Sequence, residues 1–261
     1  MSPPDAPRRA RIILGATCYA DAESALHVAV MLAHETGGEI HGLMVTDETV
    51  LEASAHPHAR TVSWTGQGAR AVSAERMLEA FRADARAFER RLAETARRAA
   101  LDFAFREARG QLIGALEAAA GRGDLLLFGA RRATPTGQGV VVIAGAVAGP
   151  DDVAADADMA ALLGLGARLA AGLGQPLVIL VPEAMRASVE AACAQAGITP
   201  ARVIGVADRA ALLARLGRMA PAAVVAGPGG ATGARPEVVI EAARCPVIIP
   251  AEAIGAAGAA G

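Results

Sequence analysis

Residues 221–250 read PAAVVAGPGGATGARPEVVIEAARCPVIIP and contain a complete unit of a parallel sheet. The short apolar run Ala223–Ala226 predicts a strand, and a glycine-rich turn at residues 227–233 follows it. Pro236 is expected at the start of a helix, where a missing N–H leaves no bond unmade. Pro246 cannot continue that helix, so the chain changes there to a closing strand. Strand, glycine turn, helix and strand form the β-α-β unit of a parallel sheet.

The same alternation of apolar strands and amphipathic helices fills the rest of the chain. Short apolar runs indicate the strands, and apolar stripes at i, i+3, i+4 and i+7 indicate the helices. Strands are expected at residues 12–16, 39–45, 101–105 and 124–129, and again at residues 140–144, 176–181 and 202–206. This restart is an internal repeat. We therefore predict an α/β protein with two tandem domains, residues 1–136 and 137–261, each an open Rossmann-like parallel sheet with helices on both faces.

This pattern resembles that of the universal stress proteins. In domains of that family, a strand is followed by a loop with the pattern Gly, two residues, Gly, nine residues, Gly and then Ser or Thr. A helix and a strand that begins with Cys-Pro-Val come next. Gly227 and Gly230 match the first two glycines, Gly233 matches the third, and residues 245–247 match the last strand. As two tandem copies, the resemblance covers nearly the whole chain. It implies a universal-stress-type fold and a role in the stress response.

The chain departs from the family where nucleotide-binding members hold their ligand. Only two residues lie between Gly230 and Gly233, where the family has nine, and Ala234 occupies the Ser or Thr position. The family's first strand ends in an Asp that meets the nucleotide. Thr17 takes that place in the first half, and a Gly-Ala pair at residues 145–146 takes it in the second. The first half also lacks the family's fourth helix and fifth strand, with the phosphate loop between them.

The glycines Gly227, Gly229, Gly230 and Gly233 form the candidate binding site. Glycines that follow a strand and precede a helix let backbone N–H groups approach an anion, helped by the helix dipole. The alternative is that they only permit a tight turn between a strand and a helix. A loop this short presents few N–H groups, and the chain has no Lys to hold a phosphate. The second interpretation is therefore favoured, with binding of a small anion left open.

Composition and charge limit the classes of partner. The chain has 25 basic residues, all Arg, and a net charge of −2, so no nucleic-acid partner is indicated. No apolar stretch approaches the ~20 residues that span a bilayer, and no export signal is recognised, so we expect a soluble cytoplasmic protein with no membrane contact. The three cysteines, Cys18, Cys193 and Cys245, are far apart and form no C-x-x-C pair, which predicts buried structural thiols.

A polar stretch with weak periodicity, residues 47–72, interrupts the first half. It holds His56, His58 and the only tryptophan, Trp64. A loop this long is typical of functional lids or of disordered segments, so we expect a solvated loop. The His-x-His pair supplies two ligands, which do not make a metal site, so no metal is predicted.

The sequence contains no recognisable catalytic constellation. The motifs G-x-S-x-G, H-E-x-x-H and G-x-x-x-x-G-K-[ST] are absent, and no catalytic residue is assigned. With the resemblance, this predicts a non-catalytic regulatory or scaffold protein with an unidentified protein partner and no cofactor. The alternative is a stress protein that binds ATP or AMP at an atypical site. A hydrolase or transferase on the same fold is a third class, because fold does not determine function.

Assembly is expected to involve the closing strand. Family members commonly pair through their terminal strand, and residues 246–249 form an apolar edge that would otherwise promote aggregation. The first half has no equivalent strand to offer. Either the two halves meet in an imperfect pseudo-two-fold arrangement, or two chains pair through this strand as a homodimer.

Overall fold

The computed structural model describes residues 10–56, 60–62, 69–71, 73–130, 139–144, 153–227 and 236–252, with the backbone alone for residues 60–62, 69–71 and 153–158. The strands are β1 Arg11–Ala16, β2 Glu39–Thr46, β3 Arg60–Val62, β4 Ala69–Ala71, β5 Phe103–Arg109, β6 Leu125–Phe128, β7 Val140–Ile143, β8 Leu177–Pro182, β9 Arg202–Val206, β10 Ala223–Ala226 and β11 Val247–Pro250. The helices are α1 Tyr19–Thr36, α2 Glu48–Ser54, α3 Ala74–Arg98, α4 Leu112–Ala119, α5 Val153–Leu173, the short 3-10 helix η1 Glu183–Met185, α6 Arg186–Gln195, α7 Arg209–Met219 and α8 Pro236–Ala243.

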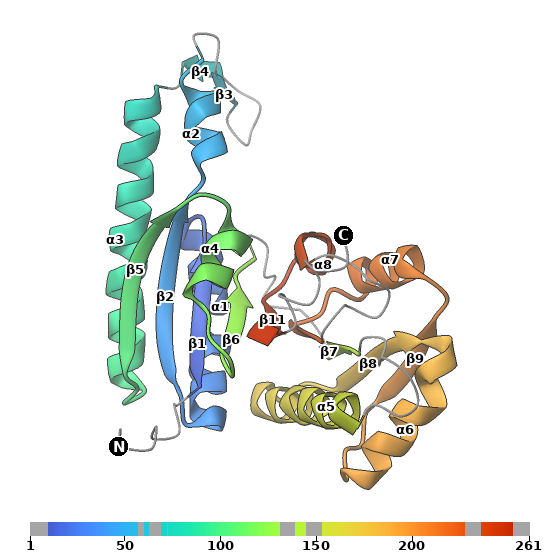
Figure 1. The fold of residues 1–261 in the computed structure, drawn as a ribbon. Coiled ribbons are helices and arrows are strands. Elements are labelled where there is room, and N and C mark those ends of the chain that lie inside the picture. The colour runs from blue at the N-terminus through green and yellow to red at the C-terminus, as the bar shows by residue number, and fades with distance from the viewer. Residues whose placement is uncertain are drawn as a thin grey trace, which may run out of the picture.

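Nine of the described strands form one continuous, mostly parallel sheet (Figure 1). Its order is β5-β2-β1-β6-β11-β10-β7-β8-β9, while β3 and β4 form a separate antiparallel pair. In each half, the second and third strands lie in order on one side of the first strand, and the fourth lies on its other side. These strands are β1, β2, β5 and β6 in the first half and β7, β8, β9 and β10 in the second. The α/β architecture predicted from the sequence is confirmed. The two predicted sheets, however, are joined into one.

The join is made by β11, the last of the described strands. It pairs in parallel with β10, where Ile248 lies opposite Val225, and antiparallel with β6, where Ile248 lies opposite Leu127. The strand thus takes the place beside β6 that a fifth strand of the first half would occupy. The two halves meet in an imperfect pseudo-two-fold arrangement, which is one of the two predicted outcomes. The homodimer alternative needs a free edge on β11, and the chain itself occupies both edges.

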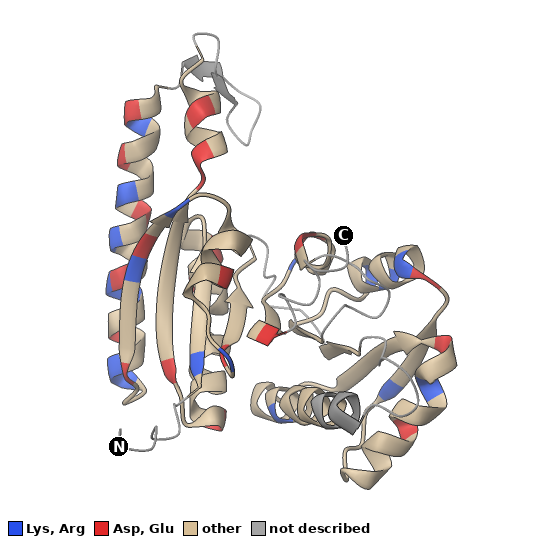
Figure 2. Ribbon diagram, in the orientation of Figure 1, with Lys and Arg blue, Asp and Glu red and all other residues tan. Residues whose placement is uncertain are grey.

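Helices cover both faces of the sheet because the side chains of each strand alternate between two apolar cores. Ile12 and Leu14 of β1 face one core, which includes residues from α1, α3, α5 and α6. Ile13 faces the other, which includes residues from α4, α7 and α8. The predicted placement of helices on both faces is therefore confirmed. In Figure 2, acidic and basic residues alternate along α3, as expected for a solvated outer face.

Side chains cap two of the helices at their N-termini. The Ser73 hydroxyl accepts a hydrogen bond from the Arg76 N–H at the start of α3. The Asp208 carboxylate accepts from the Ala211 N–H in α7 at 2.8 Å. Residues 47–72 were expected to form a loop, and this prediction is partly wrong because the stretch contains regular secondary structure.

That stretch contains helix α2 and the paired strands β3 and β4 instead of an uninterrupted loop. The Asp47 carboxylate caps α2 by accepting from the Thr49 N–H. Figure 1 shows α2 and the N-terminal part of α3 extending together beyond the sheet. His58 and Trp64 lie outside the described residues.

Candidate functional site

The topology creates two places where ligands of open α/β sheets bind. In such sheets, neighbouring strands whose connections leave in opposite directions open a crevice at their carboxyl ends. In the first half these strands are β1 and β6, and in the second they are β7 and β10. We call them the first and second switch points. The first is formed by the residues that follow Ala16 and Phe128, and the second by those that follow Ile143 and Ala226.

The first turn of α1 packs against the end of β6 at the first switch point. A Cβ atom on Gly129 would lie 2.0 Å from the Asp21 carbonyl oxygen, so the two backbones are in direct contact. The Ala130 N–H donates to the Ser24 hydroxyl at 3.2 Å, and that hydroxyl donates to the Asp21 carbonyl at 2.7 Å. Thr17, which takes the place of the family's nucleotide-contacting Asp, is half-buried just after β1. These contacts engage the Ala130 N–H, the Ser24 hydroxyl and the Asp21 carbonyl within the protein.

The N-terminus of α1 carries negative charge from another helix. The Asp84 carboxylate of α3 accepts a hydrogen bond from the Tyr19 N–H at 3.0 Å. A helix N-terminus attracts anions because its first N–H groups are unpaired and its dipole is positive there. Asp84 takes that role within the chain, and Asp21 lies in the same first turn. A phosphate approaching this end of α1 would meet carboxylates.

At the second switch point, the structure describes part of the predicted glycine site. Gly227 is buried, and its N–H donates to the Ile143 carbonyl at 3.0 Å, which extends the pairing of β10 with β7. This N–H is therefore used within the sheet and does not face a ligand. Gly229, Gly230 and Gly233 lie outside the described residues, as do residues 145–146.

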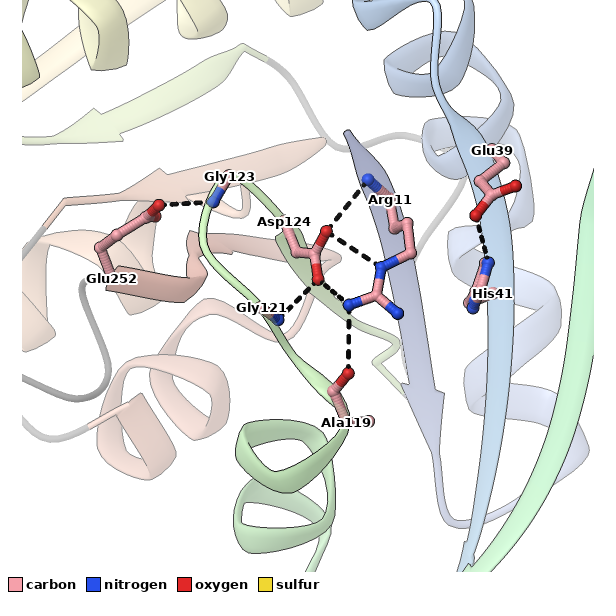
Figure 3. Close-up of polar contacts among 8 residues, drawn as sticks. All are labelled: Arg11, Glu39, His41, Ala119, Gly121, Gly123, Asp124 and Glu252. Carbon is pink, nitrogen blue, oxygen red and sulfur yellow. Dashed lines mark hydrogen bonds and ion pairs between the residues drawn. The ribbon is translucent and has the colours of Figure 1, made fainter. Parts of the chain in front are cut away.

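The strongest polar cluster lies at the opposite end of the same strands. Asp124, directly before β6, is only 2% exposed, and its carboxylate forms an ion pair with Arg11 at the start of β1 (Figure 3). The same carboxylate accepts from the Gly121 N–H at 2.7 Å, while the Arg11 guanidinium also donates to the Ala119 carbonyl. Burial alone would raise the pKa of Asp124, but the hydrogen bonds from Arg11 and Gly121 outweigh it and lower that pKa.

This cluster also holds the two halves together. The Asp124 carbonyl accepts from the Ala251 N–H at 2.9 Å, and the Gly123 N–H donates to the Glu252 carboxylate (Figure 3). Ala251 and Glu252 directly follow β11, so these bonds join the end of the second half to the start of β6. We call this region, where β11 and its following residues meet the first half, the seam.

The comparisons with known proteins concern the fold. No family model matches the sequence, and no curated protein matches it. Among solved structures, a universal stress protein from Archaeoglobus fulgidus superposes with a TM-score of 0.52 at 14% sequence identity, covering 93% of this chain and 96% of that chain. This chain has the universal-stress-type fold. A second match, MurG from Acinetobacter baumannii, has a TM-score of 0.21 and carries no inference.

Within the part of the chain that the structure describes, no three His, Cys, Asp or Glu side chains gather in a way that could hold a metal ion. None of the described helices is both long enough and apolar enough to cross a bilayer.

Sequence reasoning missed the roles of three charged residues, Asp84, Arg11 and Asp124. Asp84 lies 65 residues from the N–H that it caps, and no local pattern links them. Arg11 and Asp124 carried a signal that could have been used. Each directly precedes an apolar run. Because β1 and β6 pair with Ile12 opposite Leu125, Arg11 and Asp124 lie side by side at the start of their strands.

The cysteines allow a direct test of the buried-thiol prediction. Burial raises the pKa of Cys245 to about 12, which leaves about one thiol in ten thousand ionised at pH 8. Burial, together with the Glu190 carboxylate, also raises the pKa of Cys193. Cys18 is half-buried. Iodoacetamide at pH 8 should therefore modify Cys18 first in the folded protein and all three thiols in urea, as counted by mass spectrometry. Equal rates at Cys18 and Cys245 in the folded protein would contradict this.

Proposed function

We propose that this protein is a non-catalytic member of the universal stress type, with a regulatory or scaffold role in the stress response and no bound ATP. The observation that carries the proposal is the state of the first switch point. There the first turn of α1 touches Gly129, and the Asp84 carboxylate caps the N-terminus of α1. A nucleotide whose phosphates approached the N-terminus of α1 would bring them next to carboxylates.

The second switch point supports the same proposal by its chemistry. The Gly227 N–H is used by β7, and the sequence that follows has two residues where nucleotide-binding relatives have nine. Ala234 cannot supply the hydroxyl that donates to a phosphate. Each charge-assisted hydrogen bond that is lost weakens binding by about 1.5–3 kcal/mol, so losing two or three weakens it by on the order of a thousandfold or more.

Calorimetric titration with ATP and AMP tests the proposal. We expect no site of micromolar or tighter affinity and no ATP turnover in a phosphate-release assay. A micromolar site would support the alternative, an atypical nucleotide-binding stress protein, and turnover would support an enzyme.

Two variants would locate such a site if it appeared. Gly227→Val should abolish binding at the second switch point, because the added side chain would crowd the end of β10. Asp84→Ala should tighten binding at the first, because it removes a carboxylate from the N-terminus of α1. The matched control is Glu89→Ala, which removes an exposed carboxylate from the same helix.

A further inference from the structure

A cavity of about 560 Å³ lies at the seam. It is near the start of β1 and β6, at the opposite end of these strands from the first switch point. Both halves form its walls. The first half contributes Arg122 and Leu125 around the start of β6, and the second contributes Leu162, Leu165 and Arg168 of α5. Its volume falls in the range of about 300–1,000 Å³ that holds small organic ligands, which often bind between domains.

The inner lining of the cavity is apolar. Leu162 and Leu165 are 4% and 6% exposed, and Leu125 is a partly buried residue packed against the same core. These side chains belong to helix α5 and strand β6, which are fixed by the sheet and its core. The surface that a ligand would meet is therefore held in place before binding, which lowers the entropy cost of binding.

The polar lining of the cavity carries charges of both signs. The Asp124 carboxylate is already paired with Arg11, whereas the exposed Glu252 carboxylate accepts from the Gly123 N–H and keeps its negative charge. Arg122 is an exposed residue of the lining, and no hydrogen bond or ion pair joins its guanidinium to another of the described residues.

The second guanidinium, Arg168, is only weakly paired. It lies 3.7 Å from Glu35, and both side chains are about half exposed, so this pair contributes little. Each guanidinium offers five N–H donors in a planar fork that suits carboxylate, sulfonate and phosphate groups. The cavity thus combines an apolar interior with two cations whose donors are largely unused.

We propose that the seam cavity binds a small organic anion with an apolar body. The apolar part lies against Leu125, Leu162 and Leu165, and the anionic group lies between Arg122 and Arg168. This site is separate from both switch points, so it does not depend on the proposed absence of ATP. Because both halves line the cavity, the bound anion stabilises their junction and raises the temperature of unfolding.

The test uses decanoate as the anionic probe, with decyltrimethylammonium as a cationic probe of equal chain length. Decanoate should bind with a measurable heat below its aggregation concentration and raise the melting temperature, whereas the cation should do neither. Decanoate should also displace bound anilinonaphthalene sulfonate, and the fall in the fluorescence of that dye gives a second readout. Equal binding of the two probes, or no binding of decanoate at millimolar concentration, would overturn the proposal.

Variants locate the site. Arg122→Glu and Arg168→Glu change exposed residues and should each weaken decanoate binding about tenfold or more, since each removes a charge-assisted contact. Ala161→Trp places a large ring at an exposed position that lines the cavity and should also block binding. Arg209→Glu, an equal charge change at an exposed residue of α7 outside the cavity, should leave the affinity within about twofold. An equal loss in Arg209→Glu and Arg122→Glu, or full affinity in Ala161→Trp, would exclude this site.

Discussion

Replacing Ile248 with aspartate is expected to abolish cooperative folding of the whole chain. Ile248 is completely buried at the centre of the sheet, where it lies opposite Val225 on one side and Leu127 on the other. An unpaired carboxylate there loses its water and gains no partner. The loss should exceed about 4–5 kcal/mol, which is close to the whole stability of many domains. Circular dichroism during urea titration measures it.

The matched control is Ile248→Val, which removes one methyl group and should cost about 0.5–1.5 kcal/mol. The wild-type midpoint should not depend on protein concentration, because β11 pairs within its own chain. A strand exchanged between two chains would instead give a midpoint that rises with concentration. A folded, soluble Ile248→Asp protein with the wild-type midpoint would show that β11 does not hold the centre of the sheet.

The second large effect is expected at the buried ion pair of the seam. Asp124→Asn keeps the shape of the side chain but leaves the Arg11 guanidinium, 15% exposed, without its counter-charge. Breaking a buried pair in this way costs about 3–5 kcal/mol. Urea denaturation at pH 7 measures the loss. Glu94→Gln is the matched control, because Glu94 pairs with Arg91 and Arg98 at the surface and should change stability by less than about 1 kcal/mol.

The pH dependence of this effect has a definite sign. The pKa of Asp124 is lower in the folded protein than its usual value, because hydrogen bonds from Arg11 and Gly121 outweigh burial. Such a group stabilises the fold fully above its unfolded pKa of about 4, and the contribution is lost as the pH falls through the folded pKa. The difference between wild type and Asp124→Asn should therefore shrink below about pH 4.

A double-mutant cycle separates the pair from its surroundings. Arg11→Met combined with Asp124→Asn should destabilise the protein by less than the sum of the two single changes, because the double variant leaves no buried unpaired guanidinium. A difference between wild type and Asp124→Asn that persists unchanged at pH 3, or strict additivity in the cycle, would show that the ion pair is not the source of the effect.

The spacing of apolar residues and the positions of Gly and Pro predicted most of the fold. The apolar run Ala223–Ala226 and the run Arg202–Val206 were predicted with the bounds that the structure shows. These signals are local, since a buried strand needs consecutive apolar residues and a helix needs a stripe. The prediction was wrong at helix α2, where a polar sequence forms regular secondary structure. Helix α2 has only Ser54 buried, so its sequence carries no apolar stripe, and its pairing with α3 is a tertiary effect.

The candidate site depends on tertiary structure in the same way. Gly227 was chosen because a glycine after a strand can face an anion, but its N–H completes the pairing of β10 with β7. Whether an N–H faces a ligand or a neighbouring strand depends on which strands are adjacent. That order is not contained in any one segment. Asp84 and Asp124 likewise acquire their roles only when distant strands and helices come together.

The position of β11 has a consequence for synthesis on the ribosome. The strand in the middle of the sheet, β11, comes after all the other described strands in the sequence and is therefore made after them. Until it emerges, β6 keeps an unpaired edge, and the first half waits with an apolar strand open to other chains. Domains near the N-terminus usually complete their folding first. Here the first half stays incomplete until the second half has been made, so a nascent chain that stalls before Val247 leaves a sheet edge exposed to aggregation or to a chaperone.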